Sequence, residues 1–217
     1  SDLCNIMLRD SAHIQEFEAE WRNRKARRAG AALYEPLYEM QDALDAIELL
    51  APCDYDQKIE LYDGISVRFT DIGHLLGSAC VEIWIREEGV EKKIVFSGDV
   101  GNIHQPIIKD PTQVKEADYV VIESTYGNRL HGDETPDYIG EFTRILNETF
   151  ARGGNVVIPS FAVGRTQELL YFIREIKEKN LVTAFPNFEV YVDSPLAVEA
   201  TNVFTKNTKG CFDEDAM

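Results

Sequence analysis

Three polar residues, each following a run rich in Val, Ile and Phe, are the best candidates for chemistry in this 217-residue chain. They are His74 in the segment GHLLG, Asp99 in SGDVG and Glu123 in ESTYGNR. Polar groups at strand ends tend to converge on one edge of a sheet, so we expect these side chains to lie together. An imidazole and two carboxylates gathered at one edge can bind a metal ion or move a proton.

Taken singly, these residues also have plain structural explanations. A loop histidine such as His74 can use one ring nitrogen as a metal ligand, but it can equally be a packed histidine. Asp99 alone is more typical of a turn than of a metal bridge. The argument for chemistry therefore depends on the motifs taken together.

Two amphipathic helices are predicted ahead of these motifs. The first covers residues 11–28, places His13 in its first turn, and ends at Gly30. Its apolar face carries Ile14, Phe17 and Trp21. The second covers residues 36–50 and begins at Pro36. We expect its apolar stripe to lie in the core: Leu37, Met40, Leu44 and Ile47.

A basic cluster closes the first helix. Its members are Arg22, Arg24, Lys25, Arg27 and Arg28. The cluster could bind phosphate, although a solvated cationic helix end, favoured by the helix dipole, is the simpler interpretation. The net charge of the chain is −16, whereas nucleic-acid-binding proteins usually carry a basic surface. Any nucleic-acid function must therefore be inferred from motifs and not from charge.

The middle of the chain predicts antiparallel hairpins. Residues 58–72 alternate in polarity around an Asp-Gly turn at Asp63 and Gly64, and residues 79–96 form a second hairpin through 87–89. Residues 119–122 are continuously apolar, which predicts a buried strand.

Beyond Arg129 the pattern changes to alternating helices and strands. A helix begins at Thr135-Pro136 and is ended by Gly153-Gly154, and a second helix covers 166–179. Strands are predicted at 155–158 and 189–192. This alternation implies parallel strands with right-handed crossovers, so a second subdomain is expected to begin near residue 128.

Composition narrows the class of protein. The chain is 44% hydrophobic and 28% charged, which suits a folded core. It has no apolar run long enough to cross a membrane and no secretory signal, so we expect a soluble intracellular protein. Its four cysteines lie far apart, which favours buried free thiols over a zinc ribbon or redox pair. They are Cys4, Cys53, Cys80 and Cys211.

The order of the three motifs resembles the metallo-β-lactamase superfamily in its β-CASP branch, a group of RNA- and DNA-processing nucleases. The resemblance extends to DSAHIQ at 10–15, PSFAVGRTQE at 159–168 and DSPLA at 193–197. It thus covers nearly the whole chain. It implies an α/β fold: part of an αββα metallo-β-lactamase sandwich over residues 1–127, followed by the start of a β-CASP domain over 128–217.

The resemblance implies a hydrolase with two zinc ions. His74 would bind one zinc and Asp99 would bridge both, and a metal-activated water would attack a phosphodiester. Glu123 would be a catalytic acid that orients a proton-donating histidine, and it is not expected to be a ligand. RNA is the expected substrate, with DNA as an alternative, in cytoplasmic RNA processing or decay. The oligomeric state is left open, a homodimer included.

The chain also departs from the family pattern. The His-x-His-x-Asp-His motif, which supplies four ligands, is absent and is expected upstream of Ser1. The later β-CASP histidines are absent too, so we expect an internal piece of a longer nuclease that binds zinc weakly and is inactive alone. His131 is expected to play a supporting or surface role, and His104 has no assignable role.

The predicted turn at 160–166 is the candidate for substrate contact. Backbone N–H groups at a helix start, together with Ser160, Arg165 and Thr166, suit a phosphate. An ordinary helix cap with Arg165 paired to an acidic neighbour explains the same residues equally well.

Two other functions remain open. A small-molecule hydrolase of the metallo-β-lactamase fold would lack the Glu123 motif and the 160–167 block. A catalytically silent nucleic-acid-binding subunit of the family would have lost its metal ligands, whereas His74 and Asp99 are both present.

Overall fold

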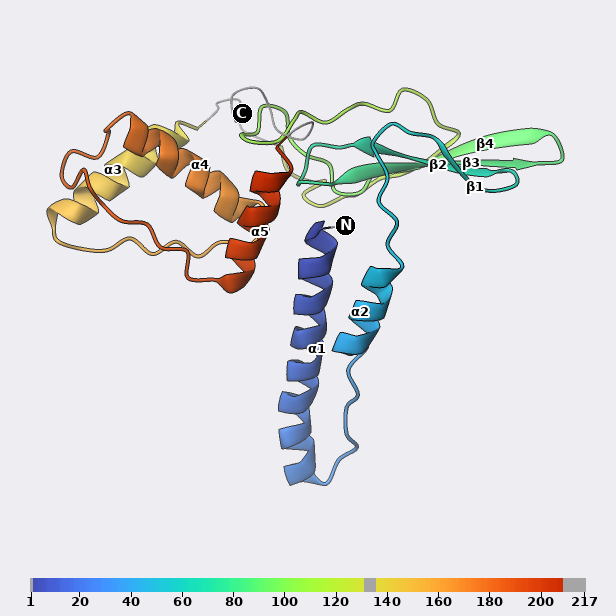
Figure 1. Ribbon diagram of the computed structural model, residues 1–217, viewed down its shortest axis with the longest axis horizontal. Helices are drawn as coiled ribbons and strands as arrows, with labels where there is room; N and C mark the ends of the chain where they lie inside the picture. The colour runs from blue at the N-terminus through green and yellow to red at the C-terminus, as the bar shows by residue number, and fades with distance from the viewer. Residues whose placement is uncertain (1, 131–135, 209–217) are drawn as a thin grey trace.

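The computed structural model describes residues 2–130 and 136–208 as an α/β protein with one five-stranded sheet and helices on either side of it in sequence (Figure 1). The sheet order is β1-β2-β3-β4-β5. The first four strands are antiparallel to their neighbours, and β5 lies parallel to β4. The strands are β1 Ile59–Tyr62, β2 Ile65–Asp71, β3 Ala79–Glu87, β4 Val90–Phe96 and β5 Tyr119–Val121.

Both predicted hairpins are confirmed. β1 and β2 turn at Asp63 and Gly64, and β3 and β4 turn at Glu88 and Gly89. Glu88 and Gly89 both have positive φ, 50° and 80°, as the favoured two-residue hairpin turn requires. Each of these strands therefore finds its partner a few residues away in the sequence.

A buried carboxylate holds the middle of the sheet together. The Glu82 side chain is 0% exposed and accepts two hydrogen bonds from Arg68, at 2.8 and 2.9 Å. Thr70 donates a third at 2.7 Å, and the Lys93 ammonium lies 2.5 Å from the second carboxylate oxygen. Burial acts to raise the pKa of Glu82, but the bonds from Arg68, Lys93 and Thr70 outweigh it and lower the pKa to about 2. The carboxylate is thus buried in its ionised form.

Two helices form an arm that extends away from the sheet (Figure 1). They are α1 Asp2–Ala29 and α2 Met40–Glu48. α1 begins nine residues earlier than predicted, and His13 is an exposed residue within it. α2 begins at Met40 and not at Pro36, because Asp42 accepts the Glu39 N–H at 2.8 Å and fixes the helix start there.

The expectation that the apolar stripe of α2 lies in the core is wrong. Leu37 is 85% exposed and Leu44 is also exposed, while Ala43 is the buried residue of this helix. α2 packs against α1, and no other helix or strand contacts it among the described residues. The amphipathic pattern correctly predicted a helix. The burial of the apolar face of that helix would also require a second element packed against it.

The second half of the chain is helical. Its helices are α3 Tyr138–Ala151, α4 Arg165–Glu178 and α5 Pro195–Lys206. A core of Leu146, Ile176, Val182 and Phe188 lies between α3, α4 and the segment after α4. α5 was not predicted, although Ser194 caps it by accepting the Ala197 N–H and Pro195 occupies its first turn.

The strands predicted at 155–158 and 189–192 do not form, which is a correction. Neither segment has a ladder partner among the described residues, and Val157 and Tyr191 are 88% and 80% exposed. The predicted burial of 119–122 is also wrong, since β5 forms but its side chains are exposed. A strand needs a neighbour for its backbone and a cover for its side chains, and an apolar sequence specifies neither by itself.

A small apolar cluster joins the two halves. It consists of the buried residues Leu76, Ile107, Ile108 and Phe204, with Leu3, Val163, Tyr171 and Val203 packed against them. The loop after β2, the start of α1, and helices α4 and α5 therefore meet at one place.

Two further expectations concern single features. Cys80 is buried as predicted, whereas Cys4 and Cys53 are exposed, and Cys211 lies outside the described residues. Within the described part of the chain, no helix combines the length and hydrophobicity that a membrane span requires.

Candidate metal and catalytic site

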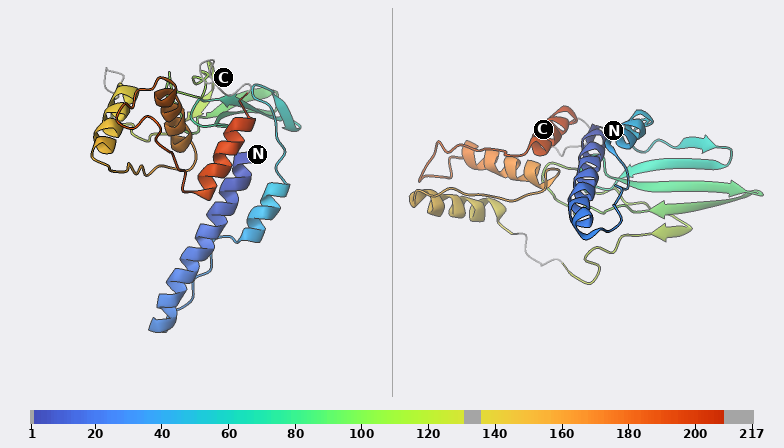
Figure 2. Two further views of the ribbon diagram at one scale, coloured as in Figure 1. Left: turned by 60° about the vertical axis from the view of Figure 1, so that its left-hand side comes forward. Right: turned by 90° about the horizontal axis from the view of Figure 1, so that it is seen from below.

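Three strands end at the same edge of the sheet and each delivers one polar side chain there. β2 and β4 are both antiparallel to β3, and β5 is parallel to β4, so their carboxyl ends coincide (Figure 2). His74 follows β2, Asp99 follows β4 and Glu123 follows β5. The structure thus brings together the three residues singled out by the sequence.

His74 and Asp99 face each other across this edge. The His74 Nε2 atom lies 4.0 Å from an Asp99 carboxylate oxygen, and the two side chains are 42% and 73% exposed. The His74 loop is fixed from beneath by Ser78, whose hydroxyl accepts the backbone N–H groups of His74 and Leu75 at 3.1 and 3.2 Å. The backbone that carries His74 is therefore held in place, and its imidazole lies beside a solvent-accessible carboxylate.

Glu123 is anchored by backbone and hydroxyl groups. Its carboxylate accepts the Val100 N–H at 2.6 Å, and its own N–H donates to the Ser97 hydroxyl at 3.0 Å. The Val100 N–H is the main cause that lowers the pKa of Glu123, followed by Thr125 and, more weakly, by the nearby His74. Glu123 is therefore ionised at neutral pH and acts as a hydrogen-bond acceptor, not as a proton donor.

The loops after β2 and β4 approach each other so closely that a glycine is required. The Gly101 N–H donates to the Ile72 carbonyl at 2.9 Å. A Cβ atom at Gly101 would lie 1.7 Å from the carbonyl oxygen of Gly73, a distance that no side chain can occupy. The spacing between the His74 and Asp99 loops thus depends on a missing side chain.

The pair of His74 and Asp99 has the donor chemistry of a zinc site. Imidazole nitrogen and carboxylate oxygen bind Zn²⁺ at about 2.0–2.2 Å, so atoms 4.0 Å apart lie within reach of one ion. A stable site needs three or four protein ligands. No group of three or more suitable side chains occurs in residues 2–130 and 136–208. The described residues fit a metal as part of a ligand set, not as a complete one.

The turn predicted to contact substrate lies against the His74 loop. A Cβ at Gly164 would lie 2.5 Å from a methyl carbon of Leu75, so the start of α4 packs directly on this loop. The Ser160 and Thr166 hydroxyls are 2.9 Å apart, and Thr166 also donates to a backbone carbonyl. Arg165 forms an ion pair with Glu168. These groups already have internal partners, and phosphate binding by the turn stays a prediction.

His104 contacts Asp110 and forms no hydrogen bond or ion pair with the three site residues. His104 is 84% exposed, and Asp110 accepts its backbone N–H at 2.6 Å, so its visible role is to shape a loop. His131 lies outside the described residues. The sequence reasoning missed the supporting groups Ser97 and Ser78. The only available signal was the position of each serine beside a glycine in the motifs.

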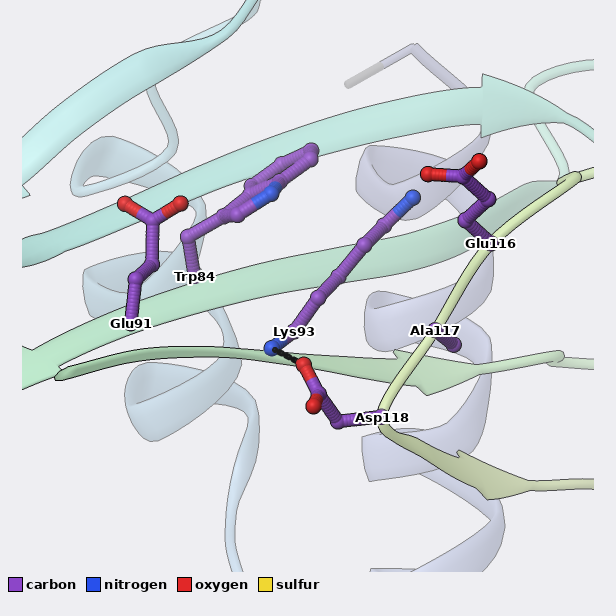
Figure 3. A pocket seen from close by; sticks show the side chains of 6 residues that line it. All are labelled: Trp84, Glu91, Lys93, Glu116, Ala117 and Asp118. Atoms are coloured by element: carbon purple, nitrogen blue, oxygen red, sulfur yellow. Dashed lines mark hydrogen bonds between the residues drawn. The ribbon is translucent and has the colours of Figure 1, made fainter.

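A hollow of about 320 Å³ lies elsewhere on the sheet, beside Trp84 and Lys93 and near the start of β5 (Figure 3). It contains none of the three site residues. The Lys93 ammonium is bound to the buried Glu82, and its backbone N–H donates to Asp118 at 2.8 Å. Lys93 and Asp118 are therefore engaged in holding the sheet together. The site formed by His74, Asp99 and Glu123, here called the strand-end site, is the better candidate for chemistry.

Comparison with known proteins agrees with this geometry. The family model described as the Beta-Casp domain matches residues 166–217. A ribonuclease of Thermus thermophilus is 34% identical over 79% of this chain and 37% of its own length. An RNase J-like protein of Methanocaldococcus jannaschii is 31% identical over 77% of the chain and 38% of its own length.

A eukaryotic protein matches over the same share of the chain. Cleavage and polyadenylation specificity factor subunit 3-I of Arabidopsis thaliana is 32% identical over 77% of the chain and 23% of its own length. The chain thus spans less than two fifths of the length of these curated relatives. The motif order, the shared edge of the sheet and these matches agree, and the chain belongs to the β-CASP branch of the metallo-β-lactamase superfamily.

Proposed function

We propose that the protein containing this chain is a metal-dependent ribonuclease that hydrolyses phosphodiester bonds during RNA processing or decay. The observation that carries the proposal is the convergence of His74, Asp99 and Glu123 at one sheet edge. Relatives named as a ribonuclease, as an RNase J-like protein and as a cleavage and polyadenylation specificity factor subunit support RNA as the substrate class. DNA remains the alternative substrate.

His74 and Asp99 would hold one side of the metal site, with the remaining ligands supplied from outside the described residues. Bound zinc would supply a water of lowered pKa and would stabilise negative charge on the phosphate. Because the loops carrying His74 and Asp99 are tied together at Gly101, the backbone would hold the two ligands close to each other.

Glu123 would act as a positioning residue. Its ionised carboxylate is fixed by the Val100 N–H, and a fixed acceptor can orient an imidazole and favour its protonated form. A protonated imidazole beside the scissile bond can deliver a proton to the leaving oxygen.

The test is cleavage of end-labelled RNA and DNA by the full-length protein. His74→Ala and Asp99→Ala should each reduce kcat by at least about 100-fold, as expected for loss of a metal ligand. His104→Ala removes an exposed loop histidine that contacts Asp110 and none of the three site residues, so it is the matched control and should retain activity. Retained activity in both site variants would overturn the assignment, and cleavage of DNA alone would correct the substrate.

A further inference from the structure

The outer face of α1 is the largest feature that the strand-end site leaves unexplained. Helix α1 projects from the body of the molecule together with α2 (Figure 1). Its second half combines exposed aromatic rings with the basic cluster of residues 22–28. Five of the seven residues in this cluster are basic and none is acidic, in a chain whose net charge is −16.

One face of α1 is used for packing within the arm. Ala12 and Ala19 are buried, Glu16 accepts the Met40 N–H at 2.8 Å, and Asn23 bonds both backbone groups of Tyr34 at 2.7 and 2.8 Å. These positions recur every three to four residues and so lie on one side of the helix. The arm is therefore held together by specific contacts along one side of α1, its inner face.

The opposite face carries the outer stripe. At about 100° per residue, its members point away from the inner face. They are Ile14, Phe17, Trp21, Arg24, Lys25 and Arg28. Phe17 and Trp21 are 60% and 51% exposed, and a hollow of about 290 Å³ opens beside them, lined by Phe17, Glu18, Trp21 and Arg22. Along this stripe, the exposed aromatic side chains are followed directly by positively charged side chains.

Two cations of the stripe have partners, but these partners are exposed. The Lys25 ammonium lies 3.6 Å from the centre of the Trp21 ring, and Arg24 bonds Glu20 at 2.7 Å on an exposed helix surface. Exposed pairs of this kind are weak, so a phosphate can replace the carboxylate. Within residues 2–130 and 136–208, neither Arg27 nor Arg28 forms an ion pair within 4.0 Å, although the charge of Arg27 acts on Glu20.

The helix dipole explains only part of this pattern. It favours cations in the last turn, at Arg27 and Arg28, but it gives no reason for exposed rings at Phe17 and Trp21. Bases that stack on aromatic rings beside a basic track are the usual arrangement in single-stranded nucleic-acid binding. The net charge of −16 opposes an anionic membrane and RNA alike, so the exposed rings, on which bases can stack, are what favours RNA.

We propose that the outer stripe of α1 binds single-stranded RNA away from the strand-end site, with phosphates on Arg24, Lys25 and Arg28 and a base stacked on Trp21. The proposal rests on the proposed function only in taking RNA as the ligand. The arm would then hold RNA near the protein independently of any metal.

The test is fluorescence anisotropy of a labelled single-stranded RNA of about 20 nucleotides, with the full-length protein in EDTA at about 50 and 200 mM salt. The variant R24Q/K25Q/R28Q should weaken binding about 10- to 100-fold and reduce the salt slope by roughly 2. The control K115Q/R152Q/K206Q removes the same charge from exposed positions elsewhere and should change affinity less than about 3-fold.

Stacking is tested separately at Trp21. Trp21→Ala should weaken binding at least about 5-fold, whereas Trp21→Phe, which keeps a ring, should lose about 2-fold or less. Equal affinities for R24Q/K25Q/R28Q and its control would overturn the proposal. Sedimentation that shows the stripe joining two copies, or equal binding of anionic vesicles through it, without any effect on RNA, would also overturn it.

Failure here and failure of the proposed function are distinguishable. Binding in EDTA requires no metal. A result that rejects RNA binding by the outer stripe therefore leaves the assignment of cleavage to His74 and Asp99 unchanged. Conversely, a protein with no nuclease activity that still binds RNA through the outer stripe would support the arm and reject the catalytic assignment.

Discussion

Residues 59–130, the sheet half, and residues 136–208, the helical half, were both predicted to contain strands. Among the described residues, only the sheet half forms a sheet. In residues 59–96 every strand meets its partner across a short turn. In residues 136–208 the strand-like segments 155–158 and 189–192 alternate with helices and remain unpaired. In a hairpin, each strand pairs with the strand next to it in the sequence. A parallel strand depends on a neighbour that lies far away in the sequence.

The difference extends to how firmly each half fixes its side chains. The sheet half has a buried ionic network at Glu82 and interlocked loops at Gly101 and Gly73. The unpaired segments leave apolar residues such as Val157 in contact with solvent. Substitutions should therefore cost much in the sheet half and little in the unpaired segments.

The largest effect is expected at Gly101. Gly101→Ala would place a Cβ atom against the Gly73 carbonyl and force the His74 and Asp99 loops apart. We expect a loss of about 3–5 kcal/mol in the free energy of unfolding, in the range of severe packing conflicts. Urea denaturation of the chain measures it.

The control lies in the neighbouring loop. Gly77→Ala introduces a Cβ with no atom within 4 Å, although Gly77 has a positive φ of 83°. It should cost only about 1–2 kcal/mol, the strain of the left-handed backbone. Equal losses at the two glycines would show that the close approach of the two loops does not exist in solution.

The second effect concerns the acid stability of the sheet. The pKa of Glu82 is about 2 in the folded chain against an ordinary value of 4.5, so the folded state favours the carboxylate. A carboxyl group whose pKa is lower in the folded than in the unfolded state stabilises the fold at pH values above its unfolded pKa. This contribution is lost as the pH falls from about 4.5 to about 2. It amounts to about 3 kcal/mol at neutral pH.

Glu82→Gln isolates this contribution. The variant leaves Arg68 and Lys93 without their counter-charge, and it should be about 3 kcal/mol less stable at pH 7. Between pH 4.5 and 2 its stability should fall less steeply than that of the unaltered chain. Parallel pH profiles for the two proteins would contradict the role given to Glu82.

The sequence was sufficient where the physical cause is local. The Asp63-Gly64 turn and the alternating strands specify hairpins, and the hairpins determine which strand ends share an edge. The gathering of His74, Asp99 and Glu123 could therefore be predicted from residue types and strand order. The hydrogen bonds that Glu123 forms with Val100 and Ser97 could not be predicted, because they depend on the exact course of two loops.

Burial was the quantity that sequence predicted poorly. The apolar stripes of α1 and α2 and the apolar strand β5 were all recognised, but Leu37, Trp21 and Val120 are exposed. A pattern shows which face of an element is apolar, whereas burial requires a second surface at the right place. The same reasoning explains why the outer stripe of α1 could be read as a helix face before any partner for it was proposed.

The smallest effect is the most direct test of the contrast between the halves. Val157→Ala changes a side chain that is 88% exposed in an unpaired segment, and it should alter the free energy of unfolding by less than about 0.5 kcal/mol. The same substitution at Val95, 5% exposed in β4, should cost about 2 kcal/mol because it opens a cavity beside Cys80. Urea denaturation compares them directly. If Val157→Ala proves as costly as Val95→Ala, residues 155–158 are paired and covered in solution, and the contrast between the two halves fails.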